Sequence, residues 1–251
     1  MLLAIDASTN WASLALVDGD IVRATRSWQI GQQHGVQIFG GIEQLLADGE
    51  ARRNDITAIG VAIGPGSFNG VRVAVTVAKT LAFVWDVPIV GVPTLDALAQ
   101  AQRRESDQDC AILAVLEAGR DELYIGWYNL RDNADVVVCE GDITIAGAAD
   151  RRLLAQVVLA GRPVLITGEL TQTHLSELAG IFEASQAIFA EPLAAPDRAL
   201  GVADIARYRL AQGQADDRLA LEPAYVRRPN ITASKRHIIP GNQQASAGNA
   251  S

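Results

Sequence analysis

Short runs of apolar residues, each bounded by turn residues, open the chain and predict strands. Three such runs cover Leu2 to Asp6, Ala12 to Val17 and Ile21 to Trp28. The residues Asp18-Gly19-Asp20 between the last two runs have the composition of a tight hairpin turn. The chain is therefore expected to begin with a meander of three strands.

Apolar residues then recur at helical spacing. Ile38, Ile42 and Leu45 predict a helix over 34–47, although Gly35, Gly40 and Gly41 lower its intrinsic helix propensity. The next predicted elements are a strand over Ala58 to Ile63, a helix over Val71 to Trp85, a strand over Pro88 to Val92 and a helix over Thr94 to Gln102. Strands and helices therefore alternate after the meander.

A polar segment over 103–109 separates this part from a second part with the same order of elements. Strands are predicted over 110–116, 123–130 and 136–140, followed by a helix over 149–159, a strand over 164–167 and a helix over 174–179. A last helix is predicted over 197–212, and an extended ending over 222–227. The tail from Asn230 onward is rich in small polar residues and is expected to be disordered.

Composition narrows the classes of protein that this chain can represent. Its 251 residues are 49% hydrophobic and 20% charged, which is enough apolar surface for a folded core. With 21 basic and 29 acidic residues the net charge is -8, so stand-alone binding of DNA or RNA is disfavoured. The two isolated cysteines, the acidic residue at position 6 and the absence of a long apolar run favour an unprocessed protein of the reducing cytoplasm.

A glycine-rich loop, Gly64-Pro65-Gly66-Ser67-Phe68-Asn69-Gly70, joins the strand over 58–63 to the next helix. Free backbone N–H groups and the helix dipole converge at such a place and can hold an anion. A phosphate-binding Walker loop requires a lysine that is absent here, and the third glycine is one place late for a dinucleotide-binding fingerprint. The loop is therefore either an anion site or a tight turn in which glycines permit a positive φ.

The first predicted strand ends in Asp6-Ala7-Ser8-Thr9, where actin-like ATPases and sugar kinases carry an Asp-x-Gly-Thr phosphate hairpin. Ser8 replaces the glycine, and its Cβ restricts how closely backbone N–H groups can approach a phosphate. The segment is thus either an ordinary turn or the remnant of a nucleotide site. The candidate residues of that remnant site are Asp6, Ser8, Gly64, Gly66, Ser67 and Gly70.

The sequence contains no motif for metal binding or for a hydrolase nucleophile. The histidines, His34, His174 and His237, are too far apart for a helical metal-binding pair, so no metal site is predicted. Ser67 lacks the first half of a nucleophile elbow, which argues against a hydrolase.

In the apolar helix over 71–85, Ala74, Ala78 and Ala82 form a stripe of small residues that fits either a core helix or a helix that also meets a partner protein.

These segments together resemble the bacterial TsaB family of tRNA threonylcarbamoyladenosine biosynthesis proteins, also called YeaZ. The resemblance extends over residues 1 to about 228, and the glycine loop followed by Arg72 is its most specific part. Asn69 departs from the family, which usually has threonine there. The segments that carry the resemblance are Ile5 to Thr9, His34, Gly64 to Arg72, Ala78 to Ala82, Gly91 to Ala99, Glu117 to Tyr124 and Pro223 to Arg227.

The resemblance implies a specific fold, which composition alone does not predict. It implies an actin-like (ASKHA, ribonuclease H-like) α/β fold with two lobes, each a mixed sheet flanked by helices. The expected lobes are residues 1–103 and 104–196, with 197–228 returning to the first lobe and 229–251 as a disordered tail.

It also implies a non-catalytic subunit of the complex that transfers threonylcarbamoyl to the tRNA adenosine beside the anticodon. The implied partners are the ATP-binding subunit TsaD, the small ATPase TsaE and, in isolation, a second copy of the chain; tRNA contacts are indirect, and the chain has no cofactor of its own. The family's partner surface is built from the first two helices. Here its candidate residues are His34, Ile38, Ile42, Leu45, Ala74, Ala78 and Ala82.

Two alternatives stay open at this point. One is a nucleotide-dependent enzyme, either a kinase-like ATPase or a glycoprotease-like hydrolase. The other is a module that binds ATP or ADP at the partner interface without turnover, through Ser67 and the backbone of Gly66 and Gly70. The second alternative is compatible with a scaffold.

Overall fold

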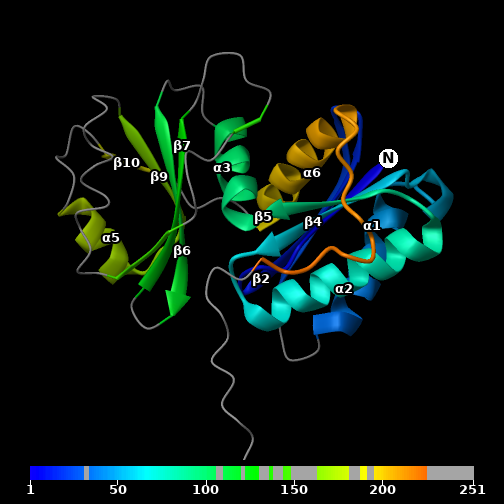
Figure 1. The fold of residues 1–251 in the computed structure, drawn as a ribbon, viewed down its shortest axis with the longest axis horizontal. Coiled ribbons are helices and arrows are strands. Elements are labelled where there is room, and N and C mark those ends of the chain that lie inside the picture. The colour runs from blue at the N-terminus through cyan, green and yellow to red at the C-terminus, as the bar shows by residue number, and fades with distance from the viewer. Residues whose placement is uncertain are drawn as a thin grey trace, which may run out of the picture.

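The computed structural model describes residues 1–30, 34–105, 110–119, 122–129, 136–137, 144–147, 163–180, 187–190 and 195–224. Within these residues, two five-stranded sheets lie apart from one another, and helices pack between them and on their outer sides (Figure 1).

The first sheet has the strand order β3-β2-β1-β4-β5. Its strands are β1 (Leu2–Asp6), β2 (Trp11–Asp18), β3 (Ile21–Gln29), β4 (Ala58–Gly64) and β5 (Ile89–Pro93). β1 pairs antiparallel with β2 and parallel with β4. Because β1 and β4 run in the same direction, the turns that follow Asp6 and Gly64 emerge at the same edge of the sheet.

Alternate residues of β1 face two different sets of helices. Leu3 and Ile5 join a core with α1 (His34–Asp48) and α2 (Phe68–Trp85), whereas Leu2 and Ala4 face α6 (Ala195–Ala211). Both faces of the central strands are buried, which explains why these strands are apolar throughout. A short 3-10 turn, η1 (Arg53–Asp55), connects α1 to β4.

The second sheet repeats the plan of the first, with the order β10-β9-β6-β7-β8. Its strands are β6 (Ala111–Gly119), β7 (Glu122–Asn129), β8 (Thr144–Gly147), β9 (Val164–Glu169) and β10 (Ala187–Phe189). β6 pairs antiparallel with β7 and parallel with β9, as β1 does with β2 and β4. Helix α5 (Gln172–Ala179) follows β9 as α2 follows β4. We call the first sheet with α1, α2 and α6 the first lobe, and the second sheet with α5 the second lobe.

Helix α3 (Thr94–Glu105) lies between α6 and the second sheet, and so joins the two lobes (Figure 1). Leu95 and Leu98 pack with Ile112 in the core of the second sheet. On its other side α3 meets Gly201 of α6, where a Cβ would lie 2.0 Å from the carbonyl oxygen of Ala97. Only glycine permits this close approach of the two helix backbones.

Polar contacts also tie α3 to the second sheet. The hydroxyl of Tyr128 donates to Asp96 at 2.6 Å, and the hydroxyl of Thr167 donates to Oε1 of Gln102 at 3.0 Å. Burial raises the pKa of Asp96, and the bond from Tyr128 offsets part of that rise. Tyr128, Gln102 and Thr167 are buried, so these hydrogen bonds satisfy polar groups that water does not reach.

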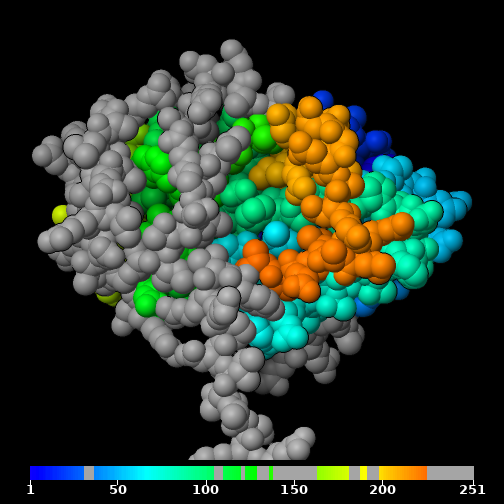
Figure 2. Space-filling model, viewed as in Figure 1, coloured from blue at the N-terminus to red at the C-terminus, as the bar shows by residue number. Residues whose placement is uncertain are grey.

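Residues 214–224 form a C-terminal strap, drawn in orange in Figures 1 and 2, which crosses the first lobe beside α2. Asp216 accepts a hydrogen bond from the backbone N–H of Gly91 at 2.7 Å, and Lys79 donates to the carbonyl oxygens of Leu219 and Leu221 at 3.0 and 2.8 Å. The N–H of Ala224 then donates to the carbonyl of Ile63 at 2.7 Å. The strap thereby covers the edge of β5 and ends beside the glycine loop.

The predicted meander and the alternation that follows it are confirmed. The strand predicted over 136–140 is wrong for Val136 and Val137, which lie outside any strand; its remaining residues, the predicted helix over 149–159 and the predicted tail from Asn230 lie outside the described residues. The short strands β8 and β10 have no counterpart among the predicted elements. None of the described helices is long and apolar enough to cross a membrane.

Candidate functional site

The glycine loop packs directly against the turn that follows β1. Ser67 donates its backbone N–H to the carbonyl oxygen of Ser8 at 2.6 Å, and its hydroxyl caps α2 by accepting from the N–H of Gly70 at 3.3 Å. A Cβ at Gly66, whose φ is +151°, would lie 2.1 Å from the Ser8 carbonyl oxygen. At Gly70 a Cβ would lie 2.0 Å from the carbonyl oxygen of Ala7. The glycines are therefore required by this close contact between two turns.

Asp6 is fully buried at the end of β1, and both of its carboxylate oxygens are occupied. Oδ1 accepts from the backbone N–H of Ser8 at 2.8 Å and from the Ser8 hydroxyl at 2.5 Å. Oδ2 accepts from Nε of Arg198 on α6 at 3.0 Å. Burying a carboxylate is costly unless hydrogen-bond donors of this kind satisfy its oxygens.

Arg198 is the centre of this network. Its side chain is buried, and besides Asp6 it donates to the backbone carbonyl of Trp11 at 3.1 Å and to Oε1 of Glu169 at the end of β9. Thr9 donates to the same Glu169 oxygen at 2.8 Å. The guanidinium thus connects β1, β2 and the second lobe.

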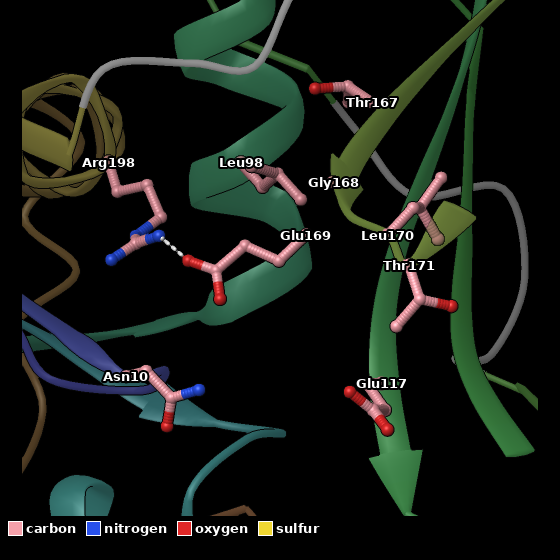
Figure 3. Close-up of a pocket in the computed structure, with 9 residues that line it drawn as sticks. All are labelled: Asn10, Leu98, Glu117, Thr167, Gly168, Glu169, Leu170, Thr171 and Arg198. Atoms are coloured by element: carbon pink, nitrogen blue, oxygen red, sulfur yellow. Dashed lines mark hydrogen bonds and ion pairs between the residues drawn. The ribbon is translucent and has the colours of Figure 1, made fainter. Parts of the chain in front are cut away.

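Two pockets of about 360 and 240 Å³ adjoin the network in the cleft between the lobes. Asn10, Glu117 and Glu169 line both, and Figure 3 shows the guanidinium of Arg198 directed at the carboxylate of Glu169. Among the described residues that line the two pockets, Arg198 is the sole cation, and carboxylates already neutralise it. This charge distribution does not favour a polyphosphate.

The residues of the remnant nucleotide site predicted from the sequence lie in and beside the two packed turns. The structure brings Asp6, Ser8, Gly66, Ser67 and Gly70 together, with Gly64 at the start of the loop. However, the backbone N–H groups and the Ser8 hydroxyl that would contact a phosphate donate hydrogen bonds within the two turns instead. Binding of ATP or ADP stays a prediction. The described residues include no group of three or more metal-ligating side chains.

Sequence reasoning missed Arg198 and Glu169. Arg198 is 192 residues from Asp6 along the chain, and Glu169 is 160 residues from Thr9. No local motif surrounds either residue, so only the fold shows that they meet.

The partner surface predicted from the sequence requires a correction. Six of its seven members are buried in the core against the first sheet, with exposed fractions from 0% to 3%, so they are not part of the chain's surface. The alanine stripe serves close packing inside the lobe. The buried residues are Ile38, Ile42, Leu45, Ala74, Ala78 and Ala82. His34 begins α1, and its side chain lies outside the described residues.

Other residues of the same two helices are exposed instead. Phe83 and Val84, near the end of α2, are 67% and 61% exposed, and Phe39 on α1 is 44% exposed. Leu219 of the strap is 78% exposed, and its neighbour Arg218 bonds to the carbonyl of Ala82 at 3.1 Å, which places the strap beside the end of α2. We call Phe83, Val84 and Leu219 the apolar patch.

Comparison with known proteins places the chain in a family. The family model described as TsaD, tRNA N6-adenosine threonylcarbamoyltransferase, matches residues 29–158. The tRNA threonylcarbamoyladenosine biosynthesis protein TsaB of Bacillus subtilis is 34% identical over 174 residues, which are 69% of this chain and 72% of the relative. TsaB of Escherichia coli is 32% identical over 132 residues, and that match spans only about half of each chain, 53% and 56%.

Solved structures show the same architecture. YeaZ from Pseudomonas aeruginosa superposes with a TM-score of 0.71 at 24% identity, covering 90% of this chain and 99% of that one. A ROK hexokinase from Thermus thermophilus superposes with a TM-score of 0.53 at 14% identity, covering 84% and 99%. The two-lobed α/β fold is therefore actin-like, as expected. Together with the Bacillus subtilis relative, these findings show that the chain belongs to the TsaB (YeaZ) family of tRNA threonylcarbamoyladenosine biosynthesis proteins.

Proposed function

We propose that this chain is a non-catalytic scaffold subunit that supports a TsaD-like subunit in transferring threonylcarbamoyl to the tRNA adenosine beside the anticodon. The observation that carries the proposal is the exposure of Phe83 and Val84 on a helix whose opposite face is fully buried in the core. Large apolar side chains that are grouped on a folded surface mark contact sites for other proteins.

The interior of the cleft supports the non-catalytic part of the proposal. A catalytic carboxylate must reach the reacting atoms, but Asp6 is 0% exposed and both of its oxygens are paired with Ser8 and Arg198. Ser67 caps α2 and has no histidine among the described residues that line its pocket.

The same surface would form the homodimer of the isolated chain, so dimer and mixed complex would compete. A TsaE-like ATPase would join the mixed complex, and tRNA would contact the chain indirectly, because a net charge of -8 repels a polyphosphate backbone. A nucleotide at the partner interface would be held mainly by the partner subunit.

The test is light scattering after size-exclusion chromatography of the chain, alone and mixed with the TsaD-like subunit of the same organism. Phe83→Asp should weaken both the homodimer and the mixed complex by about 10- to 100-fold, because it places a charge where an aromatic ring would be buried. Thermal stability should stay unchanged, since Phe83 is 67% exposed.

Ile21→Asp is the matched control. Ile21 is also apolar and 62% exposed, but it lies on β3, away from α2, so its replacement should leave both complexes intact. Full assembly by the Phe83→Asp variant would contradict the proposed surface. Magnesium-dependent ATP turnover by the chain alone, lost in Asp6→Ala, would instead favour the nucleotide-dependent enzyme.

A further inference from the structure

The two halves of the Arg198 network differ in how firmly they are held. Asp6 is 0% exposed, and its partners belong to the first lobe. The Glu169 side chain is 40% exposed and comes from the second lobe. Loss of Glu169 leaves Arg198 paired with Asp6 and with the carbonyl of Trp11, whereas loss of Arg198 leaves a buried carboxylate without its cation.

The backbone that carries Glu169 is fixed relative to its own sheet. At the preceding residue, Gly168, φ is +151° and a Cβ would lie 1.8 Å from the carbonyl oxygen of Val115 on β6. β9 is therefore held tightly against β6 at this point. On the other side, Arg198 is anchored to the first lobe by Asp6, and Thr9 donates to the same oxygen of Glu169. The contact between Glu169 and Arg198 thus joins two positions that are each rigid within their own lobe.

Helix α3 provides the other connection between the lobes, since it packs both on α6 and on the second sheet. Leu98 of α3 lines the larger pocket, and Glu169 and Arg198 lie on its walls (Figure 3). A relative movement of the lobes about α3 would therefore change the separation of Glu169 and Arg198 and the width of the pocket.

We propose that Glu169 and Arg198 form a latch between the lobes, and that release of Glu169 opens the cleft while both lobes stay folded. Asp6 is the fixed counter-ion that keeps Arg198 in place in both states. Because Glu169 is partly exposed, water can solvate its carboxylate and salt can screen its charge when the latch opens. The latch shares no residue with the apolar patch on α2 and the strap, so each proposal can fail without the other.

The test is hydrogen exchange of the full chain, comparing wild type with Glu169→Ala. Amides of the segments that line the pockets, 8–10 and 168–171, should exchange roughly threefold to tenfold faster in the variant, with little change in Tm. In about 1 M NaCl the exchange rates of the wild type should approach those of the variant. The exchange rates of the variant should change little with salt.

Glu117→Ala is the matched control, because it removes the same side chain from the same pockets, and Glu117 has no ion pair among the described residues. It should exchange like the wild type. Arg198→Met should lower Tm strongly, and Asp6→Asn in the same chain should restore part of that loss. Exchange in Glu169→Ala that matches Glu117→Ala, at low and at high salt, would overturn the latch.

Discussion

Two neighbouring glycines of α1, Gly40 and Gly41, have the same helix propensity but very different surroundings. A Cβ at Gly40 would meet nothing within 4 Å. A Cβ at Gly41 would lie 2.6 Å from Cη2 of Trp28 and 3.1 Å from Cδ1 of Leu14. Propensity alone treats both as weak points of the helix, but only Gly41 is required by the packing of α1 on the sheet.

Gly40→Ala should therefore raise the free energy of unfolding by about 1 kcal/mol, the usual gain for alanine over glycine inside a helix. Gly41→Ala has the same backbone gain, but it forces Trp28 to move and should lower the free energy of unfolding by about 1–3 kcal/mol. Urea unfolding of both variants measures the difference. Equal stabilisation by the two would show that α1 packs less closely on β2 and β3 than described.

Sequence reasoning at this scale succeeded where chemistry is local. The glycine loop and the Asp6 turn were recognised because each is a short motif at the end of a strand, and they meet because β1 and β4 are parallel neighbours. The latch could not be predicted, since Arg198 and Glu169 lie on elements that only the complete fold brings to Asp6.

Among the elements, α2 shows most clearly what an apolar sequence leaves undecided. The spacing of Ala74, Ala78 and Ala82 fits a stripe that packs in the core and a stripe that contacts a partner equally well. All three residues are buried, which shows that the stripe packs in the core. The partner face that we propose is therefore the opposite one, where Phe83 and Val84 lie. The short strands β8 and β10 escaped prediction because they contain too few residues to show a period.

A pair of glutamate substitutions on α2 separates its two faces. Ala78→Glu places a charge at a position that is 0% exposed and should lower the free energy of unfolding by more than about 3 kcal/mol. Thr80→Glu, on the exposed face of the same helix, should change it by less than about 0.5 kcal/mol. Thermal unfolding of both variants provides the comparison, and a stable Ala78→Glu variant would refute the burial of the stripe.

The whole molecule combines a cleft that contains the paired Arg198 network and an outer helix that presents apolar side chains. Asp6, Ser8 and Arg198 hold the first lobe together beneath the cleft, and Glu169 connects it to the second lobe. A ROK hexokinase shares this fold, and in the cleft of this chain Arg198 pairs with both Asp6 and Glu169. Under the proposed function, the chain contributes to tRNA modification through its surface.

The most direct test of this claim is the rate of threonylcarbamoyl transfer to tRNA by the TsaD-like subunit, supplied with an activated donor and with variants of this chain. Ser67→Ala alters the cleft and should keep transfer near the wild-type rate once the complex has formed. Phe83→Asp should reduce transfer at least about tenfold and should recover it as the chain's concentration is raised, because only assembly is impaired. Loss of transfer in an intact Ser67→Ala complex, or full transfer with Phe83→Asp at low concentration, would contradict the account.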